Sequence, residues 1–204
     1  MKPINKPIKR LSLYLFLLFF TLQTPSLADD ISDFQIEGIS LGDSLLDYFS
    51  EEEIKNNIKV PSFKNKKYVP LYVENIKTLD NYNYLSVWVK DKDKKYIIYS
   101  VEGYLNIKKS LQDCYKKQKE IIKDLNEFFE DMGIKDDGLR TRKHTGDKSG
   151  KSTFTETLFK FPDGNKIQIT CMDYGKNVLG KDSYSLSIAI DSKEYSNFLK
   201  NEAW

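Results

Sequence analysis

The most regular pattern in the chain is an amphipathic stretch at residues 110–132, and it places the tightest limit on the fold. Its apolar side chains recur at steps of three and four residues, the spacing of one helix face; they are Leu111, Cys114, Tyr115, Ile121, Ile122, Leu125, Phe128, Phe129 and Met132. Ser110 and Asp113 have the spacing of a helix cap, and Gly133 favours a stop. The pattern predicts a helix of about six turns with one buried face.

Three strand-like stretches precede this helix. Residues 67–73, 82–90 and 95–105 are rich in aromatic and β-branched side chains, which favour strands. The last two flank the polar sequence DKDK at 91–94, which favours a hairpin turn. Pro70 lacks the N–H that a sheet ladder needs, so the first strand is predicted to lie at a sheet edge.

The chain after the helix begins with a polar, glycine-rich stretch at 133–152, which predicts a long loop. Three more strands are predicted at 153–161, 166–173 and 183–191, and the sequence PDGN joins the first two as a turn. In the last strand, apolar residues alternate with serine and alanine, a pattern typical of a half-exposed antiparallel strand.

Taken in order, these elements predict an α+β fold with antiparallel sheet. We expect two helix-plus-antiparallel-β units, residues 36–107 and 108–191, packed as one domain with helices over the sheet. The repeated order of helix and three strands suggests a duplication, although the two halves share no matching residues.

The N-terminus predicts export. Lys2, Lys6, Lys9 and Arg10 precede an apolar run from Leu11 to Leu22, and small residues stand at Ser26 and Ala28. This is the layout of a secretory signal peptide, so we expect cleavage after residue 28 and a single mature domain at 29–204, periplasmic or secreted. Twelve apolar residues are too few for an uncleaved anchor, which needs about 20.

Removal of residues 1–28 also changes the charge of the chain. That segment holds four basic and no acidic residues, so the formal net charge falls from +2 to −2. A basic footprint for nucleic acid is therefore absent, and no nucleic-acid partner is expected.

Cys114 and Cys171 are the two cysteines of the chain, and we predict that they form a disulfide. Exported proteins mature in an oxidising compartment, which favours pairing. Cys114 lies on the apolar stripe of the 110–132 helix, and Cys171 shares a strand face with Ile167 and Ile169. Both sulfurs are thus expected between helix and sheet. The alternative is two separate buried thiols.

The sequence Gly42-Asp43-Ser44-Leu45 contains the letters that name the GDSL group of serine esterases and lipases. That group also needs a Gly-x-Asn-Asp block and a late Asp-x-x-His block. Neither occurs here, and His144 is the single histidine. A serine nucleophile needs an oriented base. Ser44 with Asp47 has capping-box spacing, as Ser50 with Glu53 has, so we interpret Ser44 as the cap of a helix that restarts near Ser50.

Other motifs carry little chemistry. The sequence GDKSGKS at 146–152 ends like a phosphate-binding P-loop but has three residues between its glycines where the motif needs four. We predict a solvated loop there. His144 has no metal-ligating neighbours at short spacing, and Asp91 and Asp93 lack the later ligands of a calcium loop. No cofactor, metal or catalytic residue is therefore assigned from the sequence.

Gly38-Ile39-x-Leu41-Gly42-x-Ser44, followed by a helix, resembles the opening of several small exported bacterial domains. These include outer-membrane-assembly lipoproteins and β-lactamase-inhibitor-like modules, although no cysteine for lipid attachment stands at the predicted cleavage site. The resemblance implies a non-catalytic domain that binds another protein or an envelope component. The alternative function is a serine hydrolase that uses Ser44.

Overall fold

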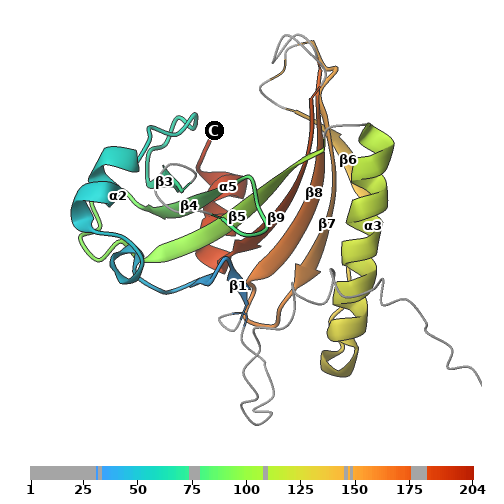
Figure 1. The fold of residues 1–204 in the computed structure, drawn as a ribbon, viewed down its shortest axis with the longest axis horizontal. Coiled ribbons are helices and arrows are strands. Elements are labelled where there is room, and N and C mark those ends of the chain that lie inside the picture. Colours follow the sequence, from blue (N-terminus) through green and yellow to red (C-terminus); the bar gives the residue numbers. More distant parts are fainter. Residues whose placement is uncertain are drawn as a thin grey trace, which may run out of the picture.

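The computed structural model describes residues 31, 34–73, 79–107, 110–144, 147, 149–175 and 183–204. The predicted signal peptide lies outside these residues. Within them, the chain forms a seven-stranded antiparallel sheet, a two-stranded ribbon and three α-helices (Figure 1). The predicted α+β class is therefore confirmed.

The N-terminal elements are short and begin at capping serines. Ribbon strands β1 (Gln35–Ile36) and β2 (Ile39–Ser40) lead to a 3-10 helix, η2 (Leu45–Asp47), and then to α2 (Glu51–Asn57). Ser44 and Ser50 each head a complete capping box, with Asp47 and Glu53 as the reciprocal partners. The predicted cap and restart are confirmed.

The large sheet has the strand order β3-β4-β5-β9-β8-β7-β6. Its strands are β3 (Tyr68–Tyr72), β4 (Tyr84–Lys90), β5 (Ile98–Ile107), β6 (Arg140–Lys143), β7 (Thr153–Lys160), β8 (Lys166–Tyr174) and β9 (Ser183–Asp191). β3 to β5 form one meander and β6 to β9 another, and the antiparallel pair β5–β9 joins them into one sheet. β3, which contains Pro70, lies at an edge as predicted.

Two expectations about the second meander are wrong. Residues 133–152 are not one long loop, because Arg140–Lys143 form β6 and pair with β7. Their polar sequence suits an edge strand whose side chains are all exposed. β9 is not half-exposed, because most of its residues are buried, including those on both faces of the strand. It lies in the middle of the sheet, between β5 and β8, and its Ser185 and Ser187 are 7% and 1% exposed.

The predicted long helix forms and packs against the second meander. α3 spans Leu111–Phe128, continues as a 3-10 turn, η3 (Glu130–Met132), and stops at Gly133, which has a φ of 66°. The predicted disulfide joins Cys114 of α3 to Cys171 of β8, with Cα atoms 5.9 Å apart. Gln118 Nε2 donates to the carbonyl oxygens of Thr155 (2.7 Å) and Ile169 (3.1 Å). Phe128, predicted for the buried stripe, is exposed.

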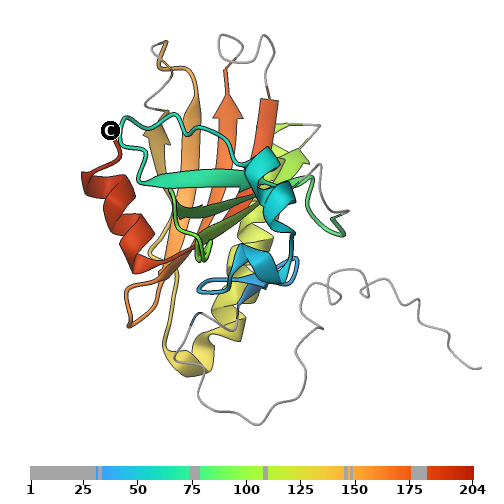
Figure 2. The same ribbon diagram turned by 90° about the vertical axis from the view of Figure 1, so that its left-hand side faces the viewer.

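The sheet has two chemically different faces. Ile167, Ile169 and Cys171 point toward α3 and belong to the main hydrophobic core, and we name this side the core face. The alternate residues form the other side, the polar face, which α5 (Lys193–Asn201) covers at one end. There Tyr195 and Phe198 pack with Tyr68 of β3 in a second, smaller core. Figure 2 shows α5 and α3 on opposite sides of the upright strands.

Candidate functional site

Ser44, the nucleophile in the hydrolase alternative, is hydrogen-bonded to the backbone around it. Its Oγ accepts the N–H of Leu46 (3.1 Å) and donates to the carbonyl oxygen of Lys95 (2.7 Å). Its own N–H donates to the Asp47 carboxylate (3.2 Å). These contacts make Ser44 a cap that also fastens η2 to the chain just before β5.

His144 lies at the other end of the sheet from Ser44. Its ring contacts Phe154 and Tyr174, with centroids 4.8 and 5.9 Å away. Ser44 pairs with Ile97, near the end of β8 that begins at Lys166, whereas Tyr174 is the last residue of β8. Eight steps of extended chain separate those ends by about 26 Å. His144 therefore cannot serve Ser44 as a base in this structure.

The stretch that ends in GKS uses its backbone donors internally. The Asp147 carboxylate accepts the N–H groups of Ser149 and Ser152, each at 2.8 Å. Hydrogen bonds from Ser149, which has the largest effect, and from Ser152 hold the pKa of Asp147 below its ordinary value. A carboxylate thus occupies the donors that a P-loop would offer to phosphate. Residues 145, 146 and 148 lie outside the described part of the chain.

Asp91 and Asp93, weighed as a calcium loop, likewise serve the hairpin between β4 and β5. The Asp93 carboxylate accepts the N–H groups of Lys95 (3.0 Å) and Ile97 (3.1 Å). In the ranges that the structure describes, no three His, Cys, Asp or Glu side chains gather as metal ligands.

The polar face is curved inward. Burial, with smaller contributions from the nearby Glu102 and Tyr72, raises the pKa of Tyr174 to about 12. α5 contacts both meanders on this face, because its Lys193 N–H donates to Asn165 Oδ1 (2.7 Å) while its Tyr195 ring packs against Tyr68 of β3. Figure 1 shows the sheet bending around α5.

Glu102 of β5 lies near the middle of this face. Burial raises its pKa to about 7, although a hydrogen bond from Tyr104 opposes the rise. Asp191 contributes to this rise in pKa, while Lys166 opposes it. Lys166 itself pairs with Asp191 at 3.2 Å, so its charge is shared between two carboxylates. Tyr104 is stacked on Tyr84 of β4, with ring centroids 4.2 Å apart.

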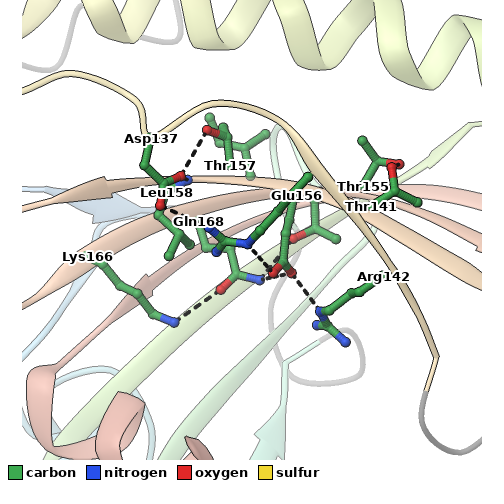
Figure 3. Close-up of polar contacts among 12 residues, drawn as sticks. Asp137, Thr141, Arg142, Thr155, Glu156, Thr157, Leu158, Lys166 and Gln168 are labelled. Atoms are coloured by element: carbon green, nitrogen blue, oxygen red, sulfur yellow. Dashed lines mark hydrogen bonds and ion pairs between the residues drawn. The ribbon is translucent and has the colours of Figure 1, made fainter.

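The margin of the sheet at β6 holds a second cluster, built around Glu156 of β7. Arg140 Nε donates to Glu156 Oε1 (3.2 Å), and Arg142 Nε donates to Oε2 (3.1 Å). Gln168 Nε2 also donates to Oε2, at 3.0 Å. Figure 3 shows Arg142 and Gln168 both pointing toward Glu156. The Glu156 side chain is 8% exposed and the two arginine side chains 46%, so a buried carboxylate positions two accessible cations.

Asp137 extends the cluster at the start of β6. It pairs with Arg140 Nη1 and with Lys160 Nζ, both at 2.9 Å, and accepts the Leu158 N–H at 2.8 Å. Partial burial pushes the pKa of Asp137 upward, but these hydrogen bonds outweigh burial and lower it to about 2. Arg140 is thereby held by two carboxylates. Arg142 uses one nitrogen on Glu156, and its remaining N–H groups have no acceptor within the described residues.

The backbone of β6 is paired on one side. His144 N–H donates to the Ser152 carbonyl (2.9 Å), which continues the β6–β7 ladder by one residue. Because antiparallel partners alternate, the N–H and C=O groups of Arg142 and Arg140 point toward β7. Those of Thr141 and Lys143 point outward, where no described residue pairs with them. β6 is thus an open edge strand.

On the core face, β6 borders a pocket beside α3. Its volume is about 270 Å³. It is lined by Gln112, Tyr115, Lys119, Leu139, Thr141 and Thr155. Thr155 Oγ1 is linked to Tyr115 Oη (3.2 Å) and to Thr141 Oγ1 (2.9 Å), so hydroxyls join helix and strands along the pocket floor.

Sequence reasoning did not identify this margin. The available signal was that Arg140 and Arg142, the only arginines after Arg10, stand two residues apart. In an extended strand that spacing puts both side chains on one face. Because residues 133–152 were interpreted as a loop, the two-residue period of a strand was not applied to the two arginines. Glu102 and Glu156 gave no signal, because only folding brings their partners to them.

Comparison with known proteins gives no assignment: no family model, curated protein or solved structure matches the chain. In the described segments, no helix is long and apolar enough to cross a membrane.

Proposed function

We propose that the protein is an exported, non-catalytic module that binds a protein or another component of the cell envelope through its β6 margin. In this proposal residues 1–28 direct export and are removed, and residues 29–204 act in the periplasm or outside the cell. The mature domain consists of two helix-plus-sheet units, with helices over the sheet.

The observation that carries the proposal is the open, pre-positioned state of β6. All four of its residues are exposed, and two of its backbone units point away from the sheet. The side chains of its two arginines are both hydrogen-bonded to Glu156, which fixes their positions. Leu139, just before the strand, is an exposed hydrophobic residue beside the α3 pocket. A positioned polar surface around an apolar anchor is suited to binding.

The serine hydrolase alternative has less support. Ser44 Oγ already donates to Lys95, and His144 lies near the opposite end of the sheet. We expect no labelling of the purified protein by a fluorophosphonate probe. Labelling that disappears in Ser44→Ala would favour the hydrolase and contradict the non-catalytic proposal.

Photo-crosslinking in the native envelope tests the binding proposal. A crosslinking amino acid replaces Leu139 at the margin or, as the matched control, Val60, which is 83% exposed and far from β6 in sequence. We expect discrete adducts from position 139 and none from position 60. Equal adducts at both positions, or none at position 139, would contradict a binding role for the margin. N-terminal sequencing of the exported protein, expected to begin at Asp29, tests the export step.

A further inference from the structure

The open margin also indicates what kind of partner it takes. We propose that β6 binds an acidic, extended segment of another polypeptide, which adds to the sheet as an eighth strand. This inference rests on the proposed function and gives it a chemical class of ligand.

The outward backbone of β6 supplies the first requirement, a set of unpaired hydrogen-bonding groups. Thr141 and Lys143 each direct one N–H and one C=O away from β7. An added strand pairs with such groups regardless of its own sequence, as in β-strand addition to a sheet edge. Water can satisfy these groups in the free protein because the strand is exposed, so the edge is stable without a bound partner.

The charge of the margin supplies the second requirement, a preference among strands. Arg140 and Arg142 of β6 and Lys160 of β7 lie together on the polar face of this margin. Glu156 and Asp137 neutralise only part of this charge, and Glu156 is the acceptor of one Arg142 nitrogen, which leaves N–H groups without an acceptor among the described residues. Since cross-strand neighbours of opposite charge are favourable, glutamate or aspartate opposite the arginines fits the surface.

The pocket beside α3 accommodates the other face of the added strand. Alternate side chains of a strand point to opposite faces, so residues between the acidic ones approach Leu139 and Tyr115. A volume of about 270 Å³ holds one side chain of medium size. The fitting sequence therefore alternates acidic residues with uncharged ones such as threonine or valine.

Charged edges also protect sheets from aggregation, and that role needs no partner. The two explanations differ in what the charges must do. A protective charge only needs to be exposed, whereas both arginines here are anchored on one carboxylate that is 8% exposed. Anchoring lowers the entropy cost of binding an anion at the margin.

The test uses a fluorescent ten-residue peptide that alternates glutamate with threonine, and a control peptide with lysine in place of glutamate. We expect the acidic peptide to bind at least tenfold more tightly by anisotropy and to lose affinity as salt increases. Amide hydrogen exchange at Thr141 and Lys143 is expected to slow on binding. Equal affinity for both peptides, or unchanged exchange at these amides, would overturn the inference.

A matched pair of variants separates the backbone from the side chains. Thr141→Pro removes one outward N–H and preserves the β6–β7 bonds, whereas Thr141→Ala keeps the N–H and loses the same hydroxyl. We expect at least a tenfold loss of peptide affinity for Thr141→Pro and less than a threefold change for Thr141→Ala. If Thr141→Pro does not fold, N-methylation of alternate peptide residues, in each of the two possible phases, removes the same bonds from the peptide side. Full affinity of both methylated peptides would contradict strand addition.

Substitution of an arginine tests the contribution of the side-chain charges. We expect Arg142→Gln to reduce affinity for the acidic peptide about tenfold. Self-association of Arg142→Gln without any peptide binding by the unaltered protein would assign the charges to protection alone and overturn the inference. Adducts from position 139 in the envelope, together with no affinity for the acidic peptide, would retain the proposed function and reject this ligand class.

Discussion

The two margins of the sheet differ in almost every respect. At β3 the outward carbonyl of Pro70 accepts the N–H of Lys59 (2.8 Å), and Pro70 has no N–H of its own to offer. Four of the five β3 residues are buried, whereas all four β6 residues are exposed. A sheet edge is a liability unless it is blocked or charged. The first meander blocks its edge, and the second leaves its edge open and fastens its helix to the sheet with a disulfide.

The disulfide is expected to give the largest effect. It joins α3 to β8 of the second meander and spans 57 residues, and the chain-entropy model assigns about 4 kcal/mol to a loop of that size. We expect Cys114→Ser with Cys171→Ser to lower the free energy of unfolding by about that amount in urea denaturation. Thiol titration of the denatured, unreduced protein checks the premise, since two reactive thiols would mean that the open margin is not covalently supported.

Glu102 tests the seam where the meanders meet. Its folded pKa of about 7 lies above the ordinary 4.5, so the folded state binds more protons than the unfolded state between these values. Stability therefore falls as pH rises from about 4.5 to about 7, by up to about 3 kcal/mol, and is flat above. We expect Glu102→Gln to remove this slope in unfolding experiments from pH 4.5 to 8. Glu52→Gln, at an exposed position of α2, is the control and should keep it.

Glu156 tests whether the arginines of the open margin are truly anchored. Glu156→Gln removes the charge that both arginines share, and we expect a loss of about 1–2 kcal/mol, because the carboxylate is buried while the arginines are half exposed. The comparison is Glu51→Gln, which disrupts an exposed pair with Lys55 and should cost less than about 0.5 kcal/mol. Equal costs in urea denaturation would show that the margin is an ordinary solvated surface.

Pro70 gives the smallest expected effect and tests the comparison most directly. Pro70→Ala restores an outward N–H at the blocked margin, and we expect a stability change within about 1 kcal/mol. The acidic peptide should still not bind there, because Lys59 retains the Pro70 carbonyl and the strand stays buried. A second peptide site in Pro70→Ala would show that the missing N–H alone, and not burial, separates the two margins.

Local patterns were informative wherever a short stretch determines its own structure. The helix at 110–132 has a three- and four-residue period, and serine caps at Ser44, Ser50 and Ser110 satisfy donors a few residues away. The disulfide was also predictable, because both cysteines stand in register with apolar neighbours whose common destination is the core.

Patterns failed where a residue's surroundings come from distant strands. Gln118 is absent from the predicted apolar stripe, yet it is fully buried, and its side-chain N–H groups donate to two strand carbonyls. The serines of β9 were predicted to line the exposed face of a half-exposed strand, yet Ser185 and Ser187 are buried. Hydrophobic alternation reports burial only when the polar face remains in water, and the curvature of this sheet removes that condition.

The sequence by itself determined the helices, their caps, the pairing of its two cysteines and the α+β class, because these depend on periodicity and on contacts near in the chain. Only the tertiary structure decided which sheet edge is open, that Glu156 holds Arg140 and Arg142, and that Glu102 titrates near pH 7. Strand order and sheet curvature set those properties. Both arise from pairing between residues dozens of positions apart, and a local sequence pattern does not identify those pairs.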